Sequence, residues 1–76
     1  MKSKTLYAVI GWQWNGYEYE PIEKFHDEDL DKARENFESI QLHEDLPMVT
    51  LREYVLESND GITWAASKMN FLDERT

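Results

Sequence analysis

The first third of the chain has the residue pattern of a β-hairpin. Residues Thr5–Trp12 are rich in β-branched, aromatic and aliphatic side chains, and Tyr17–Phe25 has a similar composition. Between them lies Asn15-Gly16, which favours a two-residue type I′ turn because both turn positions need a positive φ. Pro21 removes one backbone donor, so we expect the returning strand to be a sheet edge or to carry a bulge.

A helical period replaces this pattern in the middle of the chain. Asp27 has the residue type preferred at a helix N-cap, and the acids that follow it lie near the positive end of the helix dipole. The helix is expected to end near Leu42, since Pro47 forces Leu46 into an extended conformation. Four apolar residues recur at helical spacing and form one stripe: Leu30, Ala33, Phe37 and Ile40.

A second hairpin is predicted in the last third. Residues Met48–Glu57 and Ile62–Met69 read as strands, and Ser58 to Gly61 has turn chemistry. The element order is therefore ββαββ. This order predicts an α+β fold, with a four-stranded, mainly antiparallel sheet and one helix packed on one face. We expect a single domain over residues 1–76, in which residues 69–76 form a frayed tail.

The turn at Asn15-Gly16 also predicts how the first hairpin is paired. Trp14 would face Tyr17 and Trp12 would face Tyr19, with all four rings on one side. The aliphatic residues of the first strand share that side, which predicts that it is the core face beneath the helix: Leu6, Ala8 and Ile10. Alternatively, the rings exceed what one short helix can cover. Trp14 and Tyr17 would then stay exposed at the tip as anchors for a protein partner.

Composition indicates a folded domain with one modest core. Hydrophobic residues make up 41% and aromatic residues 13% of the 76 residues, whereas disordered chains are poor in aromatic side chains. The chain has no cysteine, so neither a disulfide nor a thiolate metal site supports the core, and we expect a cytoplasmic location. The longest apolar run, Leu6–Ile10, is far shorter than the roughly 20 residues of a membrane span. No membrane association is expected.

The net charge of the chain lies in one segment. Residues 18–45 contain eleven acidic and three basic residues, so they account for the whole formal charge of −8. A concentrated negative field steers basic partners and repels polyanions. Direct binding of nucleic acid is not expected, because phosphate contacts need clustered Lys and Arg.

The candidate interaction surface is a row of carboxylates on the predicted helix. At about 100° per residue, four acids fall within a sector of about 80°, roughly opposite the apolar stripe. They are Glu28, Asp31, Glu35 and Glu38. Glu44 and Asp45 follow near the negative end of the helix dipole, where acids do not stabilise a helix. Two ion pairs are expected to offset part of the repulsion: Glu28–Lys32 and Arg34–Glu38.

Two interpretations of this surface remain open. In one, the acidic face is merely solvated. In the other, it binds a basic protein, such as a nucleic-acid-binding enzyme or complex, and occupies its phosphate-binding groove. Small phage-encoded inhibitors act as DNA mimics in this way, and this chain is similar to them in size and composition, although no family motif is present. We therefore expect a non-enzymatic acidic interaction module that acts as an inhibitor or regulator. The competing hypothesis is a small structural or assembly protein that forms homo- or hetero-oligomers, including a homodimer, through a sheet edge or its aromatic hairpin.

The sequence indicates no catalytic residues, cofactor or metal. It has no Gly-rich phosphate loop, and its serines stand in no nucleophile-elbow setting. Asp27 to Glu38 match the ligand spacing of an EF-hand loop. However, Lys32 stands where that loop needs Gly, and the same residues carry the helical stripe. His26 and His43 would lie about 25 Å apart along the helix, so they cannot share one metal ion.

Overall fold

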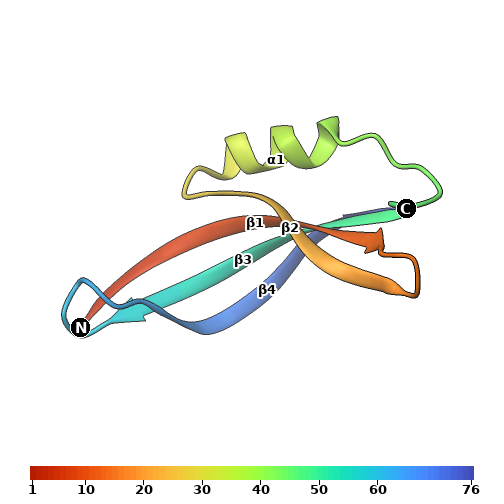
Figure 1. Cartoon of the computed structure of the whole chain (residues 1–76). Helices are drawn as coiled ribbons and strands as arrows, with labels where there is room; N and C mark the ends of the chain where they lie inside the picture. The colour runs from red at the N-terminus through yellow and green to blue at the C-terminus, as the bar shows by residue number, and fades with distance from the viewer.

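A computed structural model describes all 76 residues and confirms the predicted α+β fold. The elements follow the order ββαββ (Figure 1): β1 Lys2–Trp14, β2 Tyr19–Asp27, α1 Leu30–Ser39, β3 Met48–Ser58 and β4 Ala65–Arg75. The four strands form one sheet in the order β2-β1-β3-β4, and every neighbouring pair is antiparallel. The two central strands, β1 and β3, are therefore the first strands of the two predicted hairpins.

The helix α1 lies over one face of the sheet (Figure 1), and the hydrophobic core lies between the two. Leu30 and Ile40 are partly buried at its margin, so the predicted apolar stripe faces the sheet along its whole length. Burial of each large side chain in this core contributes roughly 2 kcal/mol. Six buried side chains form the core: Val9, Ala33, Phe37, Leu46, Val49 and Leu51.

The helix is shorter than its sequence pattern predicts. Its N-cap is Asp29, whose carboxylate accepts a hydrogen bond from the backbone N–H of Asp31 at 2.9 Å. Asp27, the predicted cap, instead ends β2 and accepts from the Asp29 N–H at 2.7 Å. The helix ends at Ser39 rather than near Leu42, and its last turn contains no basic residue.

The predicted pairing of the first hairpin is wrong. Trp14 pairs with Tyr19 rather than with Tyr17, and Trp12 pairs with Pro21. The register is shifted because residues 15–18 form a four-residue loop, not a two-residue turn. Tyr17 therefore belongs to the loop and is not paired with any residue of β1.

The Asn15 side chain explains the longer loop. Its Oδ1 accepts hydrogen bonds from the backbone N–H groups of Tyr17 at 2.8 Å and Glu18 at 2.9 Å. The Asn15 N–H in turn donates to the Glu18 carbonyl at 3.0 Å. A type I′ turn needs a positive φ at both central residues, but here only Gly16 has one, at 103°. Side-chain capping by Asn15 thus replaces the backbone turn that the dipeptide favours.

The helix covers the opposite face of the sheet from the one predicted. Side chains alternate between the two faces of β1, and Tyr7 and Val9 pack toward α1. Leu46 also packs on that face, directly over Gly11: a Cβ at Gly11 would lie 2.8 Å from Leu46 Cδ1. The missing side chain at Gly11 therefore admits Leu46 to the core. The residues predicted beneath the helix lie on the face opposite α1, where Ala8 and Ile10 are nevertheless buried: Leu6, Ala8, Ile10, Trp12 and Trp14.

The predicted tail, residues 69–76, is instead structured as far as Arg75. It forms most of β4, which pairs with β3 from Val49 to Glu57. Arg75 Nη1 donates hydrogen bonds to the carbonyls of Phe37 at 2.6 Å and Ile40 at 2.9 Å. β4 thus supplies the positive charge that the C-terminal turn of α1 lacks.

Both edge strands carry irregularities that oppose further strand pairing. The register shift in β2 leaves Lys24 as an extra residue, and Pro21 lies in the same strand. This confirms the expectation that the strand containing Pro21 is an edge with a bulge. β4 has two extra residues, Ser67 and Leu72. Bulges and proline are the usual means by which proteins protect sheet edges.

Candidate functional site

The outer side of α1 carries a row of unpaired carboxylates. Asp31, Glu35 and Glu38 are exposed. They lie on the side of the helix away from buried Ala33 and Phe37. None of the three forms an ion pair within 4 Å. We call these three residues the acidic ridge, which spans about 10 Å along the helix axis.

The two compensating ion pairs expected along the helix are wrong. Glu28 pairs with Lys4 of β1 at 3.5 Å, and Arg34 pairs with Asp73 of β4 at 3.3 Å. Both contacts join the helix region to the sheet rather than neutralising the helix surface. Glu28 therefore has a basic partner and is not counted in the acidic ridge. No basic side chain forms an ion pair with the ridge itself.

Glu44 and Asp45 are held in place through their backbone, which leaves their side chains exposed. The Glu44 carbonyl accepts a hydrogen bond from the Tyr19 hydroxyl at 3.2 Å. The Asp45 carbonyl accepts from the Trp14 N–H at 2.8 Å and from Gln13 Nε2 at 3.2 Å. These contacts fix the loop after α1 against the C-terminal end of β1. This is the end of the molecule that carries the loop between β1 and β2 (Figure 1).

The same end of the molecule carries an exposed aromatic pair. The rings of Trp14 and Tyr19 lie 5.0 Å apart between centroids, at an interplanar angle of 57°. Trp14 is 39% exposed, and Tyr17 at the loop tip is 92% exposed. We call Trp14, Tyr19, Glu44 and Asp45 the aromatic-acidic end. The sequence prediction missed Tyr19, because it assigned Tyr17 to the position opposite Trp14.

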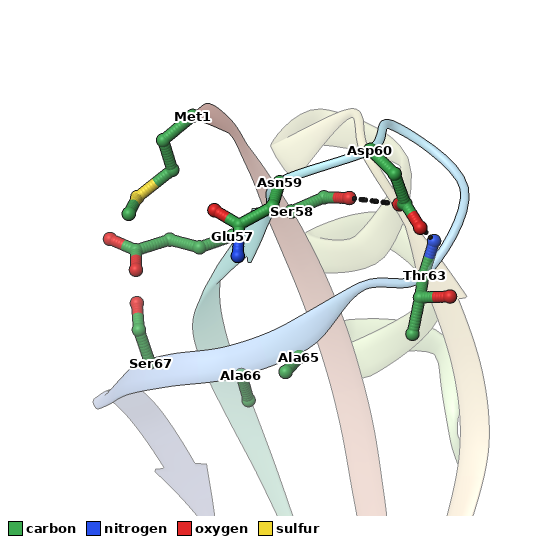
Figure 2. Close-up of a pocket in the computed structure, with 9 residues that line it drawn as sticks. All are labelled: Met1, Glu57, Ser58, Asn59, Asp60, Thr63, Ala65, Ala66 and Ser67. Carbon is green, nitrogen blue, oxygen red and sulfur yellow. Dashed lines mark hydrogen bonds between the residues drawn. The ribbon is translucent and has the colours of Figure 1, made fainter.

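A hollow of about 390 Å³ lies at the other end of the sheet, beside the turn between β3 and β4 (Figure 2). Its two serine hydroxyls are engaged: Ser58 donates to the Asp60 carboxylate at 3.0 Å, and Ser67 donates to the Val55 carbonyl at 3.2 Å. No serine there is paired with a base. The lining residues are Met1, Glu57, Ser58, Asn59, Asp60, Thr63, Ala65, Ala66 and Ser67.

Asp60 organises this turn. Its Oδ1 accepts from the N–H groups of Thr63 at 2.9 Å and Ile62 at 2.8 Å, as well as from Ser58. These hydrogen bonds hold the pKa of Asp60 below its ordinary value, because they stabilise the carboxylate form. The Oδ1 atom of Asp60 therefore holds the turn together.

Replacing Asp60 by Ala should lower the melting temperature at neutral pH, whereas Asp60→Asn, which keeps an acceptor oxygen, should lower it less. The lowered pKa means that the ionised group stabilises the fold above the ordinary aspartate pKa of about 4. This stabilisation is lost as pH falls through the lowered value. Thermal unfolding followed by circular dichroism should therefore show that the wild type and Asp60→Ala converge in acid. Equal melting temperatures at neutral pH would contradict this role.

A second hollow, of about 310 Å³, lies beside α1 and links the acidic ridge to the sheet. The residues that line it are Phe25 of β2 and, from α1, Lys32, Glu35, Asn36 and Ser39. The Asn36 Oδ1 atom is buried and has no hydrogen-bond partner. The hollow already contains a basic side chain of this protein, Lys32, although no ion pair within 4 Å joins Lys32 to Glu35.

The chain matches no family model, no curated protein and no solved structure, so the candidate site is defined by its own geometry. No three of its His, Asp and Glu side chains converge as a metal site would require. Its single helix is also not long and apolar enough to cross a membrane.

Proposed function

We propose that this protein is a non-enzymatic interaction module that binds a basic protein partner through the acidic ridge and the adjacent aromatic-acidic end. The observation that carries the proposal is that Asp31, Glu35 and Glu38 are exposed and have no ion-pair partner. Like charges one turn apart, such as Asp31 and Glu35, destabilise a helix by about 0.2–0.5 kcal/mol. A basic partner that binds the ridge neutralises these carboxylates and so relieves the repulsion between them.

The aromatic-acidic end supplies anchors beside the charge. Trp14 and Tyr19 offer apolar ring surface, and Trp and Tyr are enriched among residues that dominate binding energy. The backbone carbonyls of Glu44 and Asp45 are hydrogen-bonded to Tyr19 and Trp14, so two exposed acids lie next to these aromatic residues. Tyr17, at the tip, extends the same surface. Charge therefore steers the partner, and the rings hold it once it has docked.

The partner class that best fits this surface is a nucleic-acid-binding protein. Such proteins carry clustered Lys and Arg that contact phosphates. A rigid row of carboxylates competes for those side chains, so the module acts as an inhibitor or regulator of its partner. This is the activity expected of a phage-encoded DNA mimic or anti-defence protein. We place it in the cytoplasm, as suits a cysteine-free chain.

Reversing the acidic ridge to Asp31→Lys, Glu35→Lys and Glu38→Lys should abolish partner binding and leave the fold intact, because all three side chains are solvent-exposed. The measurement is affinity capture from a lysate of the cell that encodes or hosts the protein, with mass spectrometry of the retained proteins. Binding by the wild type should also weaken steeply as salt is raised.

The matched control reverses three acids that lie outside both the ridge and the aromatic-acidic end: Glu23→Lys, Glu57→Lys and Glu74→Lys. Both triple variants change the net charge by the same amount, so only position differs. If the control loses binding as completely as the ridge variant, net charge rather than the ridge is responsible. If capture survives both the ridge reversal and high salt, the competing assembly hypothesis is favoured.

A further inference from the structure

The loop between β1 and β2 contains an asparagine followed by a glycine, Asn15-Gly16, and both residues are exposed. The backbone nitrogen of the residue after an asparagine can attack the side-chain amide, and a Cβ on that residue obstructs the approach. Gly16 has a φ of 103°, and a Cβ built on it would meet no atom within 4 Å. Its N–H donates no hydrogen bond within the chain. The nitrogen that would attack Asn15 is therefore unhindered and has no hydrogen-bond partner to leave.

The Asn15 side-chain amide is held with its carbonyl oxygen between two donors. Oδ1 accepts hydrogen bonds from the backbone N–H groups of Tyr17 at 2.8 Å and Glu18 at 2.9 Å. An oxyanion hole places its donors about 2.7–3.1 Å from the oxygen that becomes negative when a nucleophile adds to a carbonyl carbon. The two donors therefore make Cγ of Asn15 more electrophilic and stabilise the charge that Oδ1 gains during the attack.

The other three asparagines lack this combination. Asn36 lies within α1, where the backbone N–H groups are used in helical hydrogen bonds, and Asn70 lies within the paired strand β4. Asn59 is exposed in the turn between β3 and β4, but Asp60 follows it, so a Cβ stands beside the attacking nitrogen. Asn59 is therefore the internal comparison for Asn15, since both are exposed in connections between strands.

One other glycine follows a side chain that can form the same ring, in Asp60-Gly61. There the Gly61 N–H is occupied, because it donates to Ser58 Oγ at 2.8 Å. The Asp60 side chain is also an ionised carboxylate at neutral pH, which is a much weaker electrophile than a neutral amide. The geometry therefore favours attack at Asn15 and opposes it at Asp60.

We propose that Asn15 is a site of spontaneous deamidation, which converts it to aspartate or isoaspartate. The Gly16 nitrogen releases its proton to solvent and forms a bond to Asn15 Cγ, the Cγ–Nδ2 bond breaks, and Nδ2 leaves as ammonia. Water then opens the resulting five-membered succinimide ring. Breaking the new bond to Cγ gives aspartate, whereas breaking the bond from the same nitrogen to the main-chain carbonyl carbon of residue 15 gives isoaspartate. One water molecule is consumed, one ammonia molecule is released, and no oxidant or reductant is needed.

Both products change the loop that Asn15 organises. Either product adds a negative charge to a chain of formal charge −8. In the aspartate form, a carboxylate oxygen replaces the Nδ2 group that donates to Glu20 Oε2 at 3.3 Å, so two like charges come into contact. In the isoaspartate form, the main chain passes through Cβ and Cγ, so the loop gains one backbone carbon. This inference stands apart from the proposed function, because the reaction needs no partner.

The test is incubation of the full chain in mildly alkaline buffer, followed by digestion with trypsin and tandem mass spectrometry. Trypsin cleaves after Lys and Arg, so the four asparagines fall in four different peptides. The peptide Thr5–Lys24 should gain the mass of an amide-to-acid conversion at residue 15 and should separate into aspartyl and isoaspartyl forms. Conversion should be at least about tenfold faster at Asn15 than at Asn59, because glycine leaves the attack unobstructed. Equal rates at the two positions, or an unchanged Thr5–Lys24 peptide, overturn the proposal.

Two comparisons test the roles of Gly16 and of the loop geometry. Gly16→Ala should slow conversion at Asn15 by at least about tenfold, with circular dichroism to verify that the variant is folded. For the wild type, conversion in the folded chain should be no slower than in the chain unfolded in urea, because only the fold supplies the two donors to Oδ1. A Gly16→Ala variant that converts as fast as the wild type overturns the proposal. A folded-state rate far below the rate in urea also overturns it, and this second comparison needs no variant.

Discussion

Replacing Phe37 by Asp should abolish folding of the domain. Phe37 is only 1% exposed and is among the largest side chains of a six-residue core. Truncating such a ring to Ala costs about 3–5 kcal/mol. A buried carboxylate without a partner adds a further desolvation penalty. Small domains have a total stability of only about 5–15 kcal/mol, so the variant should lack a cooperative unfolding transition in far-ultraviolet circular dichroism.

Two control variants show whether the effect of Phe37→Asp comes from burial. Ser39→Asp introduces the same side chain at an exposed position on the same helix and should remain folded. Phe37→Leu keeps most of the apolar volume and should lose far less stability than the Asp variant. A folded Phe37→Asp variant with near-wild-type stability would contradict the assignment of the helix to the core.

Replacing Arg75 by Ala should destabilise the protein by roughly 2–3 kcal/mol, a large effect for a residue second from the end of the chain. Arg75 donates to the Phe37 and Ile40 carbonyls, which lie at the end of α1. Its removal leaves these carbonyls without that donor and removes the positive charge nearest the negative end of the helix dipole. Equilibrium denaturation in urea measures the change.

The second link between α1 and β4 provides the comparison for Arg75. Asp73→Asn removes the ion pair with Arg34, whose two side chains are partly exposed, and exposed pairs are worth about 0–1 kcal/mol. Arg75→Lys keeps the charge but lacks the planar donors of the guanidinium. Its loss of stability should therefore lie between those of Asp73→Asn and Arg75→Ala. If Arg75→Ala is no more destabilising than Asp73→Asn, the capping role of Arg75 is wrong.

The element order and the helix stripe were predictable because they depend on local periodicity. Leu30, Ala33, Phe37 and Ile40 repeat at helical spacing in any context, and they face the sheet as predicted. Pro21 restricts its strand wherever it lies, and that strand is indeed a bulged edge.

The pairing of the first hairpin was not predictable from its turn dipeptide. Asn15-Gly16 is compatible with a two-residue turn, but the Asn15 side chain stabilises a longer loop. That two-residue shift replaced Tyr17 with Tyr19 as the partner of Trp14. The candidate anchor Tyr19 was consequently missed, although the residues that form the rest of the aromatic-acidic end were identified.

The sequence by itself determined that this chain folds as ββαββ and that its negative charge gathers on and around the helix, because both follow from neighbouring residues. Only the tertiary structure decided which face of the sheet the helix covers. Leu6 to Ile10 is apolar on both faces of β1, so alternation could not choose between them. The choice depends on Leu46 packing over Gly11, 35 positions away in the chain. It also depends on two residues of the last strand, β4: Arg75 forms hydrogen bonds to the end of α1, and Asp73 forms an ion pair with Arg34. These long-range contacts hold α1 on the face of the sheet that carries Tyr7 and Val9, and they leave the acidic ridge unpaired on the outer side of the helix.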